Sequence, residues 1–246
     1  MDIVEKNPLI SVVIRCKNEQ KYLPKVLAAL QDQTYTHFEI IIVDDHSQDR
    51  TLDIAKQYKC KIVSIPDTVK FSHGYSCNLG ASHANGEYLV YLNGHTIPDS
   101  RKYLESGLRN FEDPNVAGVY GPLLAHKDGT LADKLLFNTY GYIRLLIKYP
   151  ATKKSVALLA TMSAMIRTSL WQKTHFDEHI NWGMGGEDYK RAANVLDDWY
   201  TIIHDNKFRA RHSHHLKMSE LPRQLRNRKK MAGDSKQIPE AQRRHI

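Results

Sequence analysis

A polar turn directly follows an apolar stretch of the sequence. Residues 88–92 (YLVYL) run straight into Asn93, Gly94 and His95. An apolar run that ends at such a turn is typical of a buried strand, and Pro98 is expected to prevent the strand from continuing. In an open α/β sheet, ligands bind just outside the carboxyl ends of the strands, so Asn93 and His95 stand where binding or catalysis would take place. An ordinary Asn-Gly turn followed by a surface histidine would have the same sequence.

Two pairs of carboxylates also stand at positions that would present them to a ligand. Asp44 and Asp45 follow an apolar run at 38–43 and could hold a mononucleotide at the end of a strand. Glu187 and Asp188 follow a glycine-rich segment and open a predicted helix. A carboxylate on a rigid element beside a flexible loop can act as a general acid or base. Acidic residues also stabilise the first turn of any helix, so the second pair has a purely structural explanation as well.

Strands and helices alternate through the first half of the chain and would position these residues. This βαβ alternation predicts a parallel, doubly wound sheet with right-handed crossovers. Neither the Gly-x-Gly-x-x-Gly dinucleotide motif nor the Gly-x-x-x-x-Gly-Lys-Ser/Thr phosphate-binding loop occurs, which argues against both of those classes. The predicted strands are 9–14, 38–43, 61–65, 88–92 and 116–120, and the predicted helices are 22–30, 51–58, one ending near 84, and 100–111.

The second half of the chain is less regular. One domain is expected over residues 1–215, followed by a basic C-terminal tail at 216–246 that is helical and then loose. The predicted elements are a helix at 131–147, a basic loop at 148–155, a strand at 162–166, a helix at 170–175, a helix opened by the acidic pair and ending near 196, a strand at 201–203 and a helix at 217–231.

The composition indicates the class of domain, and the net charge indicates the kind of binding partner. The chain has 246 residues, 41% hydrophobic and 25% charged, which suits one large α/β domain or two small ones, with an ample core. The net charge of +8, much of it late in the sequence, favours an anionic partner. A solvated basic tail explains the same charge. Nucleic acid is not expected, because no nucleic-acid-binding motif occurs.

The cysteines and the apolar segments indicate the cellular compartment of the protein. Cys16, Cys60 and Cys77 are widely spaced and odd in number, which predicts neither a disulfide framework nor a zinc ribbon. No stretch approaches the roughly 18 apolar residues of a membrane span, and residues 1–6 lack the pattern of a signal peptide. A reducing, cytoplasmic setting is therefore expected.

Five short motifs occur in a fixed order along the chain. They are SVVIRCKNE at 11–19, VDDHSQDRT at 43–51, NLGA at 78–81, GEYLVYL at 86–92 and GED at 186–188. Together, over roughly residues 8–215, they resemble family 2 glycosyltransferases, and the variant is similar to members that act in bacterial surface polysaccharide assembly, including rhamnosyltransferase-like ones. The resemblance implies an α/β protein with the GT-A fold, which has a Rossmann-like, mostly parallel central sheet with helices on both faces.

The resemblance also implies a reaction and the residues that perform it. The reaction is inverting transfer of a sugar from a nucleotide-diphosphate sugar to a hydroxyl of a glycan or lipid-linked acceptor, in polysaccharide biosynthesis. Asp188 corresponds to the general base, and Glu187 would position it or bind the acceptor. Asp45 matches the residue that binds the nucleobase. The positions implied to bind the nucleotide sugar are Arg15, Lys17, Asp45, Asn78, Asn93 and Trp182.

The main departure from the family pattern lies at its metal-binding turn. Asn93-Gly94-His95 matches the family's Asp-x-Asp, and neither aspartate is present. The family implies Mn²⁺ or Mg²⁺, whereas imidazole suits the transition metals better than the hard cations. His95 would then be a metal ligand, with His212 or His214 as a late partner. In a metal-independent alternative, basic residues would neutralise the leaving diphosphate, for example Arg15, Lys153, Arg209 or Arg211.

Two rival classes follow from the same features. A non-catalytic module that binds nucleotide sugar or glycan would keep the fold without turnover. A sugar-1-phosphate nucleotidyltransferase is disfavoured, because residues 15–19, after the first strand, contain no glycine. The basic tail is expected to contact anionic lipid at the inner face of the membrane, where a lipid-linked acceptor would sit.

Overall fold

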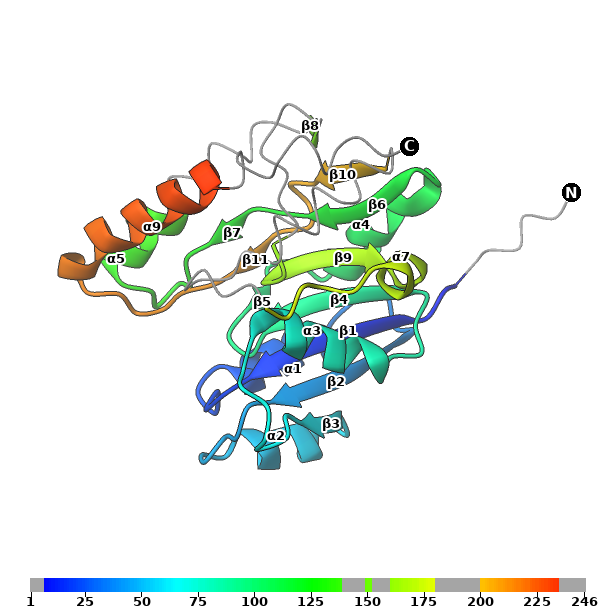
Figure 1. Ribbon diagram of the computed structural model, residues 1–246, viewed down its shortest axis with the longest axis horizontal. Helices are drawn as coiled ribbons and strands as arrows, with labels where there is room; N and C mark the ends of the chain where they lie inside the picture. The colour runs from blue at the N-terminus through cyan, green and yellow to red at the C-terminus, as the bar shows by residue number, and fades with distance from the viewer. Residues whose placement is uncertain (1–6, 139–148, 152–159, 180–199, 235–246) are drawn as a thin grey trace, which may run out of the picture.

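The computed structural model describes residues 7–138, 149–151, 160–179 and 200–234. The strands of these residues form an eight-stranded sheet in the order β3-β2-β1-β4-β9-β6-β10-β8 and a small sheet in the order β5-β11-β7 (Figure 1). The strands of the large sheet are β1 (Ile10–Cys16), β2 (Phe38–Asp44), β3 (Lys61–Ser64), β4 (Tyr88–Asn93), β6 (Val116–Tyr120), β8 (Tyr149–Ala151), β9 (Ser163–Arg167) and β10 (Thr201–His204).

The large sheet is mostly parallel. Strands β3, β2, β1 and β4 are mutually parallel. Strand β9 runs antiparallel to both β4 and β6, so β6 and its parallel neighbour β10 point the same way as β4. The predicted α/β class with a mostly parallel central sheet is confirmed. The predicted loop at 148–155 is wrong for the three residues of β8, which pair antiparallel with β10.

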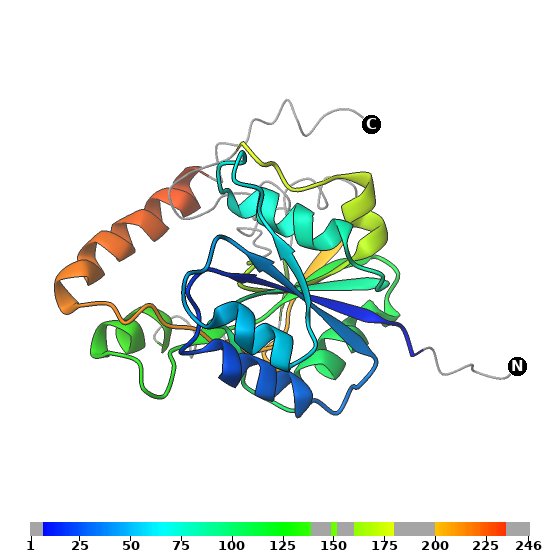
Figure 2. The ribbon, with the colours of Figure 1, turned by 90° about the horizontal axis from the view of Figure 1, so that it is seen from below.

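Helices cover both faces of this sheet because side chains alternate along the strands. In β1, Val12 and Ile14 pack with residues of α1, α2 and α4, whereas Val13 packs with residues of α3 and α7. Figure 2 shows α1 and α2 on one side of the strands and α3 and α7 on the other. The helices are α1 (Leu23–Gln31), α2 (Thr51–Gln57), α3 (His73–Ser82), α4 (Tyr103–Leu108) and α7 (Thr168–Lys173), with a 3₁₀ turn, η1 (Arg109–Glu112), after α4.

Two helices are held tightly against β1 and its neighbours. Helix α1 buries Leu23, Val26, Leu27 and Leu30, which recur at helical spacing on one face. Helix α3 approaches β1 closely, because a Cβ atom on Gly80 would lie 2.2 Å from Cγ1 of Val13. Strand β1 is therefore packed between α1 on one face and α3 on the other.

The small sheet joins segments that are far apart in the sequence. It consists of β5 (Ile97–Pro98), β7 (Leu123–Leu124) and β11 (Ala210–Arg211). Strand β11 pairs antiparallel with β5 and parallel with β7, and Ile97 lies opposite Arg211. This pairing brings the turn after β4 next to the segment that follows β11.

Pro98 has a place in the fold that the sequence analysis did not predict. The strand predicted at 88–92 ends before it, as expected, with β4 including Asn93, and Pro98 itself belongs to β5 and pairs with Ala210. Proline lacks a backbone N–H and is tolerated in edge strands. Strand β5 stands at the edge of the small sheet, so proline fits there.

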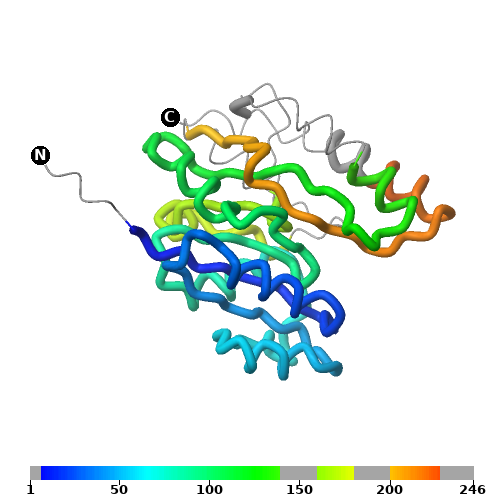
Figure 3. Tube along the Cα trace, turned by 180° about the vertical axis from the view of Figure 1, so that it is seen from behind, coloured from blue at the N-terminus to red at the C-terminus, as the bar shows by residue number. Residues whose placement is uncertain are grey.

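The C-terminal part of the described chain packs against an irregular helical segment. That segment consists of α5 (Leu131–Asp133) and the π-helix η2 (Lys134–Asn138), and Figures 1 and 3 show it beside α9 (Leu221–Asp234), which follows the 3₁₀ turn η3 (Met218–Glu220). Leu216, at the start of the predicted tail, is buried in a cluster with residues of α5 and η2. The helix predicted at 131–147 extends outside the described residues. None of the helices in the described ranges combines the length and apolarity needed to cross a bilayer.

Candidate functional site

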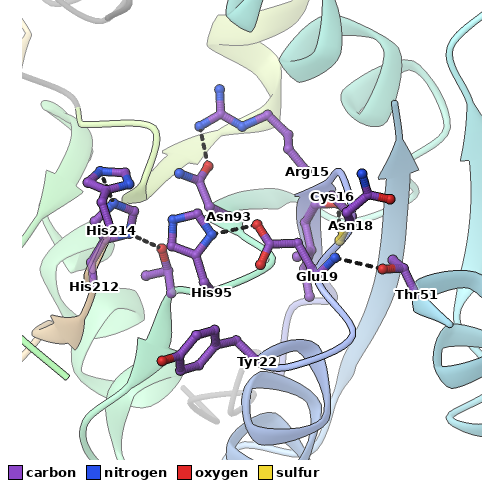
Figure 4. A network of polar contacts seen from close by, with 12 residues as sticks. Arg15, Cys16, Asn18, Glu19, Tyr22, Thr51, Asn93, His95, His212 and His214 are labelled. Carbon is purple, nitrogen blue, oxygen red and sulfur yellow. Dashed lines mark hydrogen bonds and ion pairs between the residues drawn. The ribbon is translucent and has the colours of Figure 1, made fainter. Parts of the chain in front are cut away.

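Three histidines meet beside the carboxyl end of β4. One ring nitrogen from each of His95, His212 and His214 lies within 4.8 Å of the others (Figure 4). The Nε2 atoms of His212 and His214 are 3.1 Å apart, and the ring centroids of His95 and His212 are 4.5 Å apart. The pairing of β5 with β11 produces this cluster, because it places residues 95 and 212 side by side.

The donor atoms of the cluster suit a divalent transition metal. Nitrogens bound about 2.1 Å from one metal lie roughly 3.0–3.4 Å apart, which matches the separation of His212 from His214. The Nε2 atom of His95 is buried and has no hydrogen-bond partner among the described residues. A buried acceptor of this kind is costly unless something binds it, so the observation supports a cation beside His95.

Arg15 and Asn93 lie next to this cluster at the ends of β1 and β4. The two residues are register partners, and Nη2 of Arg15 donates to Oδ1 of Asn93 at 2.7 Å. Arg15 also donates to the backbone oxygen of Thr161 at 3.1 Å, and only 7% of its surface is exposed. A buried guanidinium therefore stands behind the turn that carries His95.

Lys17 and Asp45 form an ion pair at the ends of β1 and β2. Their side chains approach to 2.8 Å, and the backbone N–H of Asp45 donates to the carbonyl of Cys16 at 2.9 Å. The Asp45 side chain is largely buried, whereas that of Lys17 is mostly exposed. Asp45 is thus fixed at the sheet edge, with the ammonium group of Lys17 beside it.

Asn78 lies in a different environment from the one the resemblance implies. Its Nδ2 donates to the carbonyl of Phe176 at 2.9 Å and to Glu178 at 2.8 Å. Its Oδ1 accepts from Trp171 Nε1 and from the backbone N–H of Phe176, both at 3.0 Å. These four bonds occupy the hydrogen-bonding capacity of the amide, so the structure gives Asn78 a packing role between α3 and α7.

The remaining predicted residues divide into two groups. Arg209 and Arg211 both bind Asp99, through Nε atoms at 2.9 and 2.6 Å. The other predicted positions lie outside the described residues, namely Lys153, Trp182, Glu187 and Asp188.

Sequence reasoning missed the residues that contact His95 from other elements. Glu19 Oε1 lies 2.5 Å from His95 Nδ1, and His126 Nε2 donates to the carbonyl of His95 at 2.8 Å. Burial lowers the pKa of His126. Glu19 had one signal in the sequence, its place in the polar exit of the first strand. His126 had none, because its proximity arises only from the fold.

Comparison with known proteins gives a consistent family assignment. The family model described as glycosyl transferase family 2 matches residues 11–174. The O-antigen chain rhamnosyltransferase RfbN of Salmonella typhimurium is 26% identical over 211 residues, which are 83% of this chain and 66% of RfbN. The O-antigen chain rhamnosyltransferase WbaN of Salmonella anatum is 32% identical over 193 residues, which are 76% of this chain and 60% of WbaN. The chain thus spans less than two thirds of the length of these curated relatives.

Solved structures show the same fold. The mannosyltransferase PcManGT of Pyrobaculum calidifontis, in complex with GDP-Man and Mn²⁺, superposes with a TM-score of 0.71 at 16% identity, covering 98% of this chain and 66% of that one. S. aureus TarS in complex with UDP-GlcNAc gives a TM-score of 0.64 at 16% identity, covering 85% of this chain and 59% of that one. These similarities establish the GT-A fold. Because the family model also matches more than half of its residues, this chain belongs to glycosyl transferase family 2.

Proposed function

We propose that this chain transfers a sugar, with inversion, from a nucleotide-diphosphate sugar to a hydroxyl of a glycan or lipid-linked acceptor during polysaccharide assembly. The observation that carries the proposal is the cluster of His95, His212 and His214 beside the Arg15–Asn93 pair. Both stand at the carboxyl edge of the sheet, where open α/β proteins bind their ligands. The relatives named as rhamnosyltransferases favour an enzyme over a non-catalytic binding module.

A divalent metal fits this site. His95, His212 and His214 would hold it, and it would neutralise the charge that develops on the departing diphosphate. Mn²⁺ is the first ion to test, because PcManGT was solved with Mn²⁺ and because manganese accepts imidazole more readily than magnesium does.

The chain's own residues would bind the donor around that position. Arg15 would stabilise negative charge near the turn while it holds Asn93 in place, and Asp45 would bind the nucleobase beside Lys17. Asp188 would accept the proton of the acceptor hydroxyl, and Glu187 would position it or bind the acceptor. Trp182 would contact a sugar ring of the bound nucleotide sugar. The names of the relatives make an activated deoxyhexose such as rhamnose the first donor to try, ahead of the mannose and N-acetylglucosamine donors of PcManGT and TarS.

Helix α9 would bring the enzyme to a lipid-linked acceptor at the cytoplasmic face of a membrane. Its sequence is rich in arginine and lysine, and Arg223, Leu225 and Arg226 are exposed. Basic residues near a surface gain about 1 kcal/mol each from anionic lipid. Co-sedimentation with phosphatidylglycerol vesicles, but not phosphatidylcholine vesicles, is expected, and the double variant R223E/R226E should lose it. Equal sedimentation of the variant would contradict this contact.

Donor turnover tests the main proposal. Purified protein would be incubated with UDP-, GDP- and dTDP-sugars and a lipid-linked oligosaccharide acceptor, with Mn²⁺, Mg²⁺ or EDTA. Release of one nucleoside diphosphate with transfer to the acceptor supports the proposal, and Asp188→Asn should lower turnover by about 100-fold or more while donor binding persists. Donor binding without any release would favour the non-catalytic module instead.

A further inference from the structure

The carboxylate of Glu19 determines which nitrogen of His95 carries a proton. His95 Nδ1 and Glu19 Oε1 lie 2.5 Å apart, with only 18% and 15% of the respective side chains exposed (Figure 4). An ionised carboxylate can only accept hydrogen bonds, so the ring proton of a neutral His95 lies on Nδ1. The lone pair then lies on Nε2, the buried atom that has no hydrogen-bond partner among the described residues.

The neighbouring ring is held in a similar way. His212 Nδ1 lies 3.0 Å from Oγ1 of Thr96, and Thr96 is fully buried. The rings of His212 and His214 have centroids 4.5 and 5.5 Å from that of His95. Two adjacent imidazoles therefore have Nδ1 engaged by an oxygen from a different segment, which leaves their Nε2 sides to form the cluster.

Glu19 is itself fixed by three other parts of the fold. Its backbone N–H donates to Oγ1 of Thr51, at the start of α2, at 2.7 Å. Its carbonyl accepts from the backbone N–H groups of Tyr22 at 3.0 Å and Leu23 at 2.9 Å, where α1 begins. Its side chain packs against Gly94, in the same turn as His95. The backbone of Glu19 is therefore fixed on both sides, and its side chain extends from that fixed point past Gly94 to His95.

We propose that Glu19 is a positioning residue which holds His95 in the Nδ1–H tautomer and aims its Nε2 at a metal shared with His212 and His214. The inference rests on the proposed function, which assigns the metal to these histidines. A carboxylate behind a metal-binding imidazole fixes the ring and makes it a stronger ligand. Because all three donors are imidazole nitrogens, the site takes Co²⁺, Zn²⁺ or Mn²⁺ in preference to Mg²⁺.

Direct metal binding tests this role without any assay of transfer. Metal-free protein would be titrated with CoCl₂ and, separately, with MgCl₂ in a calorimeter. Glu19→Ala should bind Co²⁺ about 10–100-fold more weakly than the wild type, and Glu19→Gln, which keeps an acceptor oxygen, should fall between them. Mg²⁺ should bind the wild type at least about tenfold more weakly than Co²⁺.

A matched control and a second readout separate positioning from general damage. The control variant Glu39→Gln also removes a partly buried carboxylate. Glu39 binds Ser11 and Asn85, at the end of the strands opposite the histidine cluster, so the Co²⁺ affinity of this variant should equal that of the wild type. Long-range ¹H–¹⁵N spectra of the metal-free protein should show the Nδ1–H tautomer of His95 in the wild type and a mixture of tautomers in Glu19→Ala.

The outcomes distinguish this inference from the proposal beneath it. Equal Co²⁺ affinity in the wild type and Glu19→Ala, or an unchanged His95 tautomer, overturns the role of Glu19 and leaves the three-histidine site standing. A wild type that binds no Co²⁺ overturns both the role of Glu19 and the three-histidine metal site. A wild type that binds Co²⁺ but transfers no sugar overturns the proposed reaction alone.

Discussion

Gly94 packs directly against Glu19. A Cβ atom at position 94 would lie 2.5 Å from Cγ and 2.9 Å from Cβ of Glu19, far inside van der Waals contact. The backbone N–H of Gly94 donates to the carbonyl of Arg15 at 2.8 Å, so the turn cannot easily move away. The glycine between Asn93 and His95 therefore allows the close approach that brings Glu19 to His95.

Gly94→Ala should weaken metal binding without altering any ligand. The added methyl group must displace the Glu19 side chain, so we expect Co²⁺ affinity to fall about tenfold or more, together with a loss of about 1–3 kcal/mol in the free energy of unfolding. Calorimetric titration and urea unfolding measure the two effects. In a Glu19→Gly background, where Cβ and Cγ are both absent, the same substitution should change Co²⁺ affinity little. A full additional loss there would show that the methyl group acts on something other than Glu19.

Asn78→Ala should affect stability rather than donor binding. The substitution leaves the buried Nε1–H of Trp171 and the N–H of Phe176 without their acceptor, and each loss costs roughly 1–3 kcal/mol. We expect the free energy of unfolding to fall by about 3 kcal/mol, measured by urea denaturation at a temperature where the variant stays folded. The Kd for the donor's nucleoside diphosphate should stay within about twofold of the wild type. A large increase in Kd with unchanged stability would instead support the nucleotide-binding role that the family resemblance implies.

The long apolar runs made most of the central sheet predictable. Strands β1, β2 and β4 are continuous, mostly buried segments ended by polar turns, and their alternation with helices allows few topologies. The two-residue strands β5, β7 and β11 were missed, because so short a segment has no periodicity and is defined only by its partners. Local pattern could not place Pro98 in a strand for the same reason.

Part of the histidine cluster could likewise be predicted from the sequence, and part could not. The position of His95 at the end of a strand could be recognised from its neighbours, and the family resemblance singled out His212 and His214. The contact of Glu19 with His95 spans 76 residues of sequence and depends on the packing of α1 and Gly94. Pairing across such a distance has no local signature, so the residue that orients His95 could be found only in the structure.

Cys60 should make stability fall at alkaline pH. Burial raises the pKa of its thiol from 9.0 to about 11, so the unfolded chain releases this proton at a lower pH than the folded protein does. The associated stability is fully present below pH 9 and is lost as pH rises toward 11. Between pH 8 and pH 10 we expect the wild type to lose about 1 kcal/mol relative to Cys60→Ala, measured by urea unfolding. Parallel pH profiles of the two proteins would contradict the shifted pKa.

Arg209 and Arg211 provide the sharpest test between metal-dependent and metal-independent catalysis. Both use Nε to bind the largely buried carboxylate of Asp99, and Arg211 also donates to the carbonyl of Ala125 at 3.0 Å. Because these contacts hold both arginine side chains on Asp99, Arg209→Gln should change the Kd for the nucleoside diphosphate by less than about threefold.

Removal of the metal by chelation should reduce donor turnover more than Arg209→Gln does. With the wild type, EDTA should lower donor turnover by at least about 100-fold, since a metal at a leaving group supplies several kcal/mol of charge stabilisation. Restoring Mn²⁺ in excess should recover turnover, and His95→Ala should respond to neither treatment. If instead EDTA leaves turnover unchanged and Arg209→Gln lowers it tenfold or more, the basic residues neutralise the diphosphate, and the three histidines serve another purpose.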